Sequence, residues 1–105
     1  MTVDSSQVVR ESADKVRRRY PDANIWVFGS CARGDASNES DIDVCVVIPE
    51  MHSKDRFVIS DLAWDVSFYH NVHLSTIVFS QKDFDDGPAS TNPLIDVIKT
   101  EGIAA

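Results

Sequence analysis

The chain of 105 residues has few cysteines and no long apolar run. Its two cysteines, Cys31 and Cys45, are too few for a disulfide framework, so we expect both to be free thiols, as in a reducing cytosol. No apolar stretch approaches the ~20 residues that a membrane-spanning helix requires. The amino terminus has neither the basic start nor the apolar stretch of a secretory signal. These absences predict a cytoplasmic protein without a membrane partner.

Basic residues are also scarce. Ten Lys and Arg residues against seventeen Asp and Glu residues give a formal net charge of −7. Because broad nucleic-acid binding relies on many Lys and Arg contacts with phosphates, stable nucleic-acid binding is not expected. Five basic residues nevertheless cluster in one ten-residue stretch: Arg10, Lys15, Arg17, Arg18 and Arg19. A solvated helix face is the favoured interpretation of this cluster, and a site for an anionic substrate is the alternative.

The apolar residues that are present follow helix and strand periods. A hydrophobic fraction of 43% over 105 residues fits a single globular domain, residues 1–105. Spacings of three and four predict helices over 5–20, 54–70 and 92–101, and short apolar runs predict strands over 24–28, 41–48 and roughly 72–80. Residues 81–87 are expected to form a polar turn. The order predicts an α/β fold, a small mixed sheet of at least three strands with helices packed on it. The direction of the third strand stays open.

The expected helix 54–70 has more apolar surface than one sheet face requires. One stripe contains Val58, Leu62, Val66 and Tyr69, and a second contains Phe57, Trp64 and Phe68. Both are interpreted first as core, and a docking surface for a partner is the alternative for the second. The two tryptophans, Trp26 and Trp64, are likewise expected in the core. His52 and His70 flank the helix and are expected at the surface or as caps.

The most informative stretch is 29–43, which lies between two expected strands. Gly29 lets the backbone approach a phosphate closely, and Ser30 offers a hydroxyl and a main-chain N–H at a helix start, an arrangement that attracts anions. Arg33, one turn later, can neutralise a triphosphate or pyrophosphate. A plain structural turn is the alternative for the Gly-Ser pair alone.

Two carboxylates open the second expected strand. Side chains of a strand alternate between faces, so Asp41 and Asp43 share one face with α-carbons roughly 6.5–7 Å apart. Two such carboxylates repel each other unless a cation lies between them, and hard oxygen ligands suit Mg²⁺. A solvated strand edge or a cap is the alternative for this pair alone. Together with the Gly-Ser turn, the pair predicts metal-assisted attack on a nucleotide's phosphorus, with pyrophosphate leaving.

This combination of residues resembles a known family signature. Gly29-Ser30-x-Ala32-Arg33-Gly34 followed by Ser40-Asp41-Ile42-Asp43 is similar to the motif of the DNA polymerase β-type nucleotidyltransferase superfamily, and most similar to its minimal nucleotidyltransferase domains. The resemblance implies the nucleotidyltransferase fold, a nucleoside triphosphate on the Gly-Ser turn and two Mg²⁺ ions on Asp41 and Asp43. It also implies transfer of AMP from ATP to a hydroxyl, and an antitoxin-like role in which the acceptor is a tyrosine of a HEPN-type toxin.

The sequence departs from that family at the third acid. The family supplies a further carboxylate from the next strand, whereas the matching position here is His73. A register shift of two gives Asn71 or Ser75, and neither is an acid. His73 has three interpretations: a neutral metal ligand or general base, the mark of a weakened enzyme that binds a nucleotide without turning it over, or an ordinary polar residue near a strand start. In the second case the protein is a regulatory or antitoxin subunit that acts by contact, and it can be an oligomer.

Overall fold

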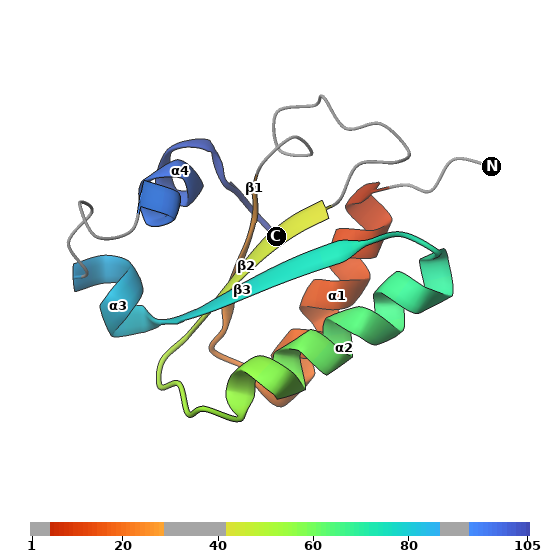
Figure 1. Cartoon of the computed structure of the whole chain (residues 1–105), viewed down its shortest axis with the longest axis horizontal. Helices are drawn as coiled ribbons and strands as arrows, with labels where there is room; N and C mark the ends of the chain where they lie inside the picture. Colours follow the sequence, from red (N-terminus) through yellow and green to blue (C-terminus); the bar gives the residue numbers. More distant parts are fainter. Residues whose placement is uncertain (1–4, 29–41, 87–92) are drawn as a thin grey trace.

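The structure of the chain is a computed structural model that describes residues 5–28, 42–86 and 93–105. Its elements follow the order α1 (Ser5–Arg19), β1 (Asn24–Phe28), β2 (Ile42–Ile48), α2 (Asp55–His70), β3 (Leu74–Ser80), α3 (Gln81–Asp86), α4 (Pro93–Glu101) and β4 (Ile103–Ala104) (Figure 1). The expected α/β class is confirmed. None of the helices in these ranges is long and apolar enough to cross a membrane.

The strands form one mixed sheet in the order β3-β2-β1-β4. β1 pairs antiparallel with β2 and with β4, whereas β2 and β3 are parallel. The parallel pairing settles the direction of the third strand, since α2 returns the chain to the end of the sheet where β2 began. As a result the end of β1, the start of β2 and the start of β3 all lie at the same end of the sheet.

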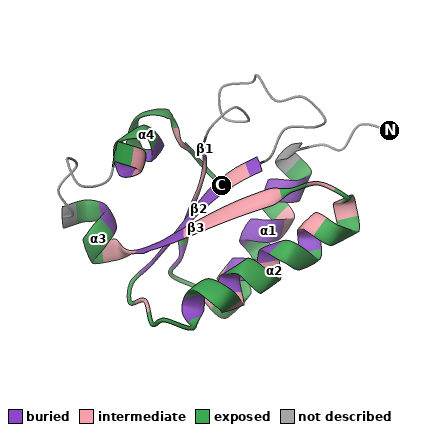
Figure 2. Ribbon diagram, viewed as in Figure 1, coloured by how far each residue is buried: buried purple, intermediate pink, exposed green. Residues whose placement is uncertain are grey.

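The two faces of the sheet have different covers. Alternate residues of β2 (Ile42, Val44, Val46 and Ile48) face a buried aliphatic cluster made with α1 and α2. The intervening residues Cys45 and Val47 face a second cluster, which is closed by Phe84 of α3 and by Ile95 and Ile98 of α4. Figure 2 shows the buried inner stripes of α1 and α2 against the sheet. The helix α3 lies at the end of the sheet opposite the start of β2, whereas α4 packs beside β1 (Figure 1).

One expectation about local structure was wrong, and one strand was not foreseen. Residues 81–86 form the helix α3 instead of a turn, because the hydroxyl of Ser80 accepts a hydrogen bond from the N–H of Asp83 at 3.1 Å and Phe84 is buried. The strand β4 was not expected. It pairs Ala104 with Trp26 and Ile103 with Val27, contacts that depend on backbone groups more than on side-chain pattern.

The exposed stripe of α2 also differs from expectation. The helix buries Ile59, Ala63 and Val66, while Trp64 and Tyr69 are 61% and 81% exposed, so neither belongs to the core. Phe57 and Phe68 are exposed as well. Trp26, in contrast, packs against the second cluster and stacks on Phe84.

Polar contacts tie α1 to α2 at both ends. The Tyr20 hydroxyl donates to the buried carboxylate of Asp55 at 2.8 Å, and this carboxylate also accepts from the backbone N–H of His52 at 2.8 Å. Near the other end, the ring of His70 hydrogen-bonds the carboxylate of Glu11 at 2.5 Å. His70 therefore joins the two helices instead of lying at the surface, whereas His52 is exposed as expected.

Candidate active site

The candidate site lies at the end of the sheet where β1 ends and where β2 and β3 begin. Phe28, the last residue of β1, pairs with Asp43 of β2, and Asp43 pairs on its other side with Ser75 of β3. The described residues on either side of the segment 29–41 are therefore neighbours in the sheet. This arrangement follows from antiparallel β1–β2 pairing and parallel β2–β3 pairing.

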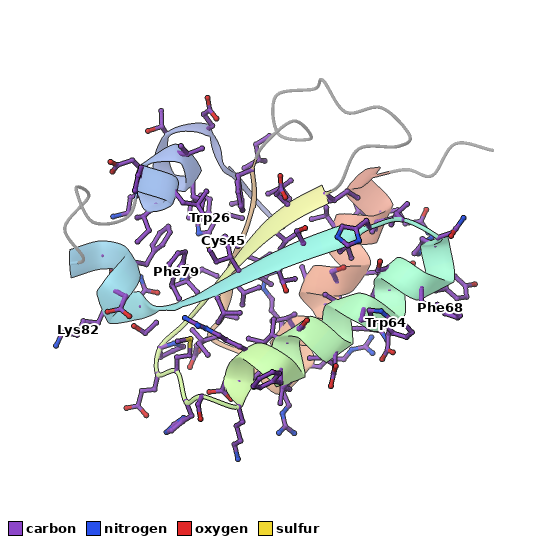
Figure 3. The ribbon with its side chains drawn as sticks, in the orientation of Figure 1. Trp26, Cys45, Trp64, Phe68, Phe79 and Lys82 are labelled. Carbon is purple, nitrogen blue, oxygen red and sulfur yellow. The ribbon has the colours of Figure 1, made fainter. Side chains whose placement is uncertain are left out.

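Asp43 lies on the sheet face opposite α1 and α2. Because strand side chains alternate, Asp43 shares its face with Cys45 and Val47, and paired residues of neighbouring strands share it too. Asp43 is half-buried, and the residues paired with it on this face are Phe28 and Ser75. The helices α3 and α4 pack on this face through a cluster that includes Phe28, Cys45 and Val47 (Figure 3). A carboxylate in partial contact with solvent, beside a hydroxyl, is a suitable oxygen ligand for a hard cation.

Several predicted site residues lie outside the described ranges. These are Gly29, Ser30, Arg33 and Asp41, so their roles stay predictions, as does the thiol state of Cys31. Within 5–28, 42–86 and 93–105, no three His, Cys, Asp or Glu side chains gather closely enough to hold a metal ion. A metal site at this end of the sheet therefore needs a ligand beyond Asp43, and Asp41 is the residue that the sequence offers.

The β2–β3 register identifies the residue that lies beside Asp43. That residue is Ser75, whereas His73 precedes β3 by one residue and joins the ladder through its backbone carbonyl, which accepts from the N–H of Ile42 at 2.9 Å. His73 is exposed and lines an open hollow with Trp64 and Phe68. Ser75 is thus a site residue that sequence reasoning treated only as a register alternative. The period of two in a strand leaves that choice open.

Two other side chains with functional chemistry, Cys45 and Asp65, have structural roles here. Cys45 is a free, fully buried thiol, and burial raises its pKa to about 12, which keeps it protonated and unreactive at neutral pH. Asp65 lies on α2 and pairs with Lys15 of α1 at 3.9 Å, away from the sheet face that carries Asp43. Neither supplies the third carboxylate.

Relatives with assigned names fit this picture. Over 79 residues the chain is 30% identical to a provisionally named protein adenylyltransferase of Methanocaldococcus jannaschii, covering 74% of this chain and 71% of that protein. A second provisionally named protein adenylyltransferase of the same organism is 28% identical over 95 residues, covering 86% of this chain and 63% of that protein. The chain thus spans about two thirds of the length of these relatives.

A solved structure has the same fold. A chain in the crystal structure of a toxin–antitoxin with AMP-PNP superposes with a TM-score of 0.66 at 18% identity, covering 90% of this chain and 69% of the other. The family model described as a nucleotidyltransferase domain matches residues 9–100, which include the strands β1, β2 and β3, the segment 29–43 and the paired residues Phe28, Asp43 and Ser75. The chain therefore belongs to the nucleotidyltransferase domain family.

Proposed function

We propose that the protein transfers AMP from ATP to a hydroxyl group of a partner protein, in a reaction that depends on Mg²⁺. Family membership supports nucleotidyl transfer as the reaction class, and the names of the two archaeal relatives support a protein as acceptor. The toxin–antitoxin neighbour supports a toxin as that partner, and a HEPN-type toxin is the proposed acceptor.

One observation carries the proposal. Phe28, Asp43 and Ser75 are aligned across three strands at the end of the sheet from which the segment 29–41 departs and to which it returns. In the sequence, Gly29 and Ser30 follow Phe28 directly, and Asp41 precedes Ile42 directly. This adjacency in sequence to the aligned strand ends supports a shared phosphate and metal site.

The donor set at this end fits a divalent cation. Asp43, together with Asp41, would hold Mg²⁺ through carboxylate oxygens, and Gly29, Ser30 and Arg33 would hold the phosphates. When bound, the metal neutralises the negative charge of the phosphates and supports the attack of a hydroxyl on phosphorus. The role of the chain is to fix the Asp43 carboxylate on a rigid central strand, so that the nucleotide is bound in one orientation.

The test is a transfer assay with purified protein, ATP, Mg²⁺ and the protein encoded by the neighbouring gene as acceptor. The expected product is the partner protein heavier by one AMP, measured by intact-mass spectrometry, and its formation should stop when EDTA removes Mg²⁺. Asp43→Asn should abolish the product, whereas Asp65→Asn should not, because Asp65 lies on α2, on the other side of the sheet, and pairs with Lys15 of α1. Equal transfer by the Asp43→Asn variant and the wild type would overturn the assignment.

A second candidate function is binding without turnover. It is favoured by the chemistry of β3, since the residue beside Asp43 is a serine and no carboxylate occurs between Leu74 and Ser80. In that case the protein neutralises its partner by contact, and complex formation tolerates Asp43→Asn. Isothermal titration of the partner with both forms separates the two functions: a complex without AMP transfer supports contact, and transfer supports the enzyme.

The cellular setting proposed is the cytoplasm, where ATP and Mg²⁺ are available. The free thiol of Cys45 is compatible with a reducing compartment. Stable binding to nucleic acid is not part of the proposal, given the net charge of −7.

A further inference from the structure

The two sides of the β3-β2-β1 core of the sheet differ in whether a further strand pairs with them. The outer edge of β1 is paired with β4, and the N–H of Ala105 extends this pairing by donating to the carbonyl of Ile25 at 2.8 Å. No strand in the described part of the chain pairs with the outer edge of β3. β3 is seven residues long and contains neither a charged residue nor proline, which are the usual protections of an exposed edge.

The backbone groups at this edge can be identified from the β2–β3 pairing. The carbonyl of His73 accepts from Ile42 of β2, so the backbone groups of every second residue after it also point to β2. The N–H and C=O groups of the alternate residues therefore point away from the sheet; these residues are Leu74, Thr76, Val78 and Ser80. The four are distributed symmetrically about Ile77, the middle residue of β3.

Exposed aromatic residues of α2 flank this same edge. Phe57 and Ser60 line an open groove of about 460 Å³ whose floor is residues 76–79 of β3. Trp64 and Phe68 line a second hollow of about 640 Å³ with His73, beside the start of β3. The two aromatic rings of this second hollow stack on each other at a centroid distance of 5.1 Å (Figure 3).

We propose that the β3 edge and these α2 aromatics form a dimer interface that binds a second copy of this chain. A two-fold axis through Ile77 would pair β3 antiparallel with its copy, placing Thr76 opposite the copy's Val78 and Leu74 opposite its Ser80. All four outward-facing residues would then exchange backbone hydrogen bonds. The strand itself is uncharged, which suits such self-pairing, although Arg56 of α2 also lines the groove beside it.

The same axis matches the helices. Because α2 connects two parallel strands, it runs opposite to β3, with Phe57 near the strand's end and Phe68 near its start. The two-fold rotation exchanges these ends, so it carries Phe57 of one copy toward the hollow formed by Trp64 and Phe68 of the other. Ser60, a small residue between these aromatic positions, permits close approach of the two helices.

The available area is adequate for a specific dimer. Phe57, Trp64 and Phe68 are 75%, 61% and 73% exposed. Aromatic side chains of this kind bury about 150–250 Å² each, so with the strand edge the contact would cover roughly 500 Å² per copy, or about 1,000 Å² in total. This value is at the lower limit for a specific interface, so a weak, concentration-dependent dimer is expected. The inference does not depend on the proposed transfer reaction.

The experiment is sedimentation velocity from low micromolar to near-millimolar protein, with hydrogen exchange at both limits. The wild type should shift from monomer to dimer. Phe57→Glu should raise the dimer dissociation constant by about 30-fold or more, the effect of removing an interface hot spot. Ser60→Arg should act in the same direction by placing two cations near the axis. Tyr69→Glu is the matched control, because Tyr69 is an aromatic of the same helix, 81% exposed, that lines neither hollow.

Hydrogen exchange tests the strand pairing itself. The amides of Thr76 and Val78 should exchange more slowly in the dimer than in the monomer, while that of Ile77, already bonded within the sheet, should change little. A wild type that stays monomeric throughout would overturn the proposal, even if it binds another protein. A dimer that tolerates Phe57→Glu and Ser60→Arg, or one without slowed exchange at Thr76 and Val78, would overturn it too. Because Phe57 and Ser60 are exposed, both variants should keep the wild-type circular dichroism spectrum.

Discussion

The two faces of β2 differ in what they contribute to the protein. On one face, Ile42, Val44, Val46 and Ile48 are all buried and contact the aliphatic layer of α1 and α2 along the whole strand. On the other, only Cys45 and Val47 are fully buried, and the face ends in the half-buried carboxylate of Asp43. One strand thus has a continuous core on one face and a partial core joined to the candidate site on the other.

This difference explains how so small a domain can hold a charged group rigidly. A carboxylate at the end of a strand is held in position when the opposite face of that strand is buried against a layer of packed helices. Each side chain next to Asp43 in sequence, Ile42 and Val44, is buried in the aliphatic layer. Neighbouring residues of β2 therefore serve different purposes, one for stability and the next for the candidate site. A substitution at the first should mainly lower the free energy of unfolding, and a substitution at the second should mainly lower the activity.

The largest effect is expected from a charge placed on the closed face. Val44 is 3% exposed, with no cation near it among the residues of its cluster. Val44→Asp would bury an unpaired carboxylate, which should lower the free energy of unfolding by about 4–5 kcal/mol or more. Urea denaturation followed by circular dichroism measures this change. Val44→Thr, which keeps the shape and replaces one methyl group with an uncharged hydroxyl, is the control and should fold.

The reverse substitution, one residue earlier, should spare the fold and remove the activity. Asp43→Val replaces a half-buried carboxylate with a β-branched residue that suits a strand. We expect an unfolding free energy within about 1 kcal/mol of the wild type. AMP transfer should fall about 1,000-fold, equivalent to about 4 kcal/mol of transition-state stabilisation. If Asp43→Val unfolded as readily as Val44→Asp, the separation of the two faces would be wrong.

Introducing a carboxylate on or just before β3 tests which position corresponds to the family's third acid. Ser75 lies directly beside Asp43, whereas His73 lies one residue before the strand. If the weak point of the site is the absent third acid, Ser75→Asp should raise transfer about tenfold or more relative to the wild type, as a positioned acid–base group contributes. His73→Asp is the matched variant. A gain only with His73→Asp would show that this residue, and not Ser75, occupies the position of the third acid.

Much of the fold could be predicted from the sequence, for identifiable physical reasons. β1 was predicted at Asn24–Phe28 because Pro21-Asp22 and Gly29 delimit a short apolar run. α2 and β3 were predicted within a few residues. The α3 helix was missed because six polar-rich residues resemble a turn unless the Ser80 cap and the burial of Phe84 are recognised together.

The site was less predictable than the fold. Sequence alone proposed Asp43 on a strand start, and the structure gives it the neighbours Phe28 and Ser75. The β2–β3 register depends on packing across the sheet, since sliding a strand by two residues preserves its face pattern. Trp64 was expected in the core because its size and type favour burial. One small sheet, however, covers only one side of the sixteen-residue helix α2, and Trp64 lies on another side.

The smallest expected effect is a loss of stability at low pH, caused by protonation of the carboxylates that connect α1 and α2. Hydrogen bonds from the His52 N–H and the Tyr20 hydroxyl lower the pKa of Asp55, and a hydrogen bond from His70 lowers the pKa of Glu11. A carboxyl group whose pKa is lowered in the folded state stabilises the fold at any pH above its pKa in the unfolded chain, which is 3.8 for Asp55 and 4.5 for Glu11. This stabilisation is lost as the pH falls through the pKa of the folded state. Thermal melts between pH 7 and pH 3 should therefore show a falling midpoint.

The acid-dependent part of this fall should be smaller in Asp55→Asn, because the amide cannot be protonated in that range. High pH should weaken the same Tyr20–Asp55 contact, through ionisation of the Tyr20 hydroxyl. Burial, and then the hydrogen bond to Asp55, raise the pKa of Tyr20 above 10.0, so its contribution is present below pH 10 and is lost as pH rises further. The candidate site lies on the opposite face of the sheet, so nucleotide binding by the folded fraction should not depend on Asp55→Asn. A loss of binding in that variant, with the fold retained, would show that the two faces are coupled more tightly than their separate clusters imply.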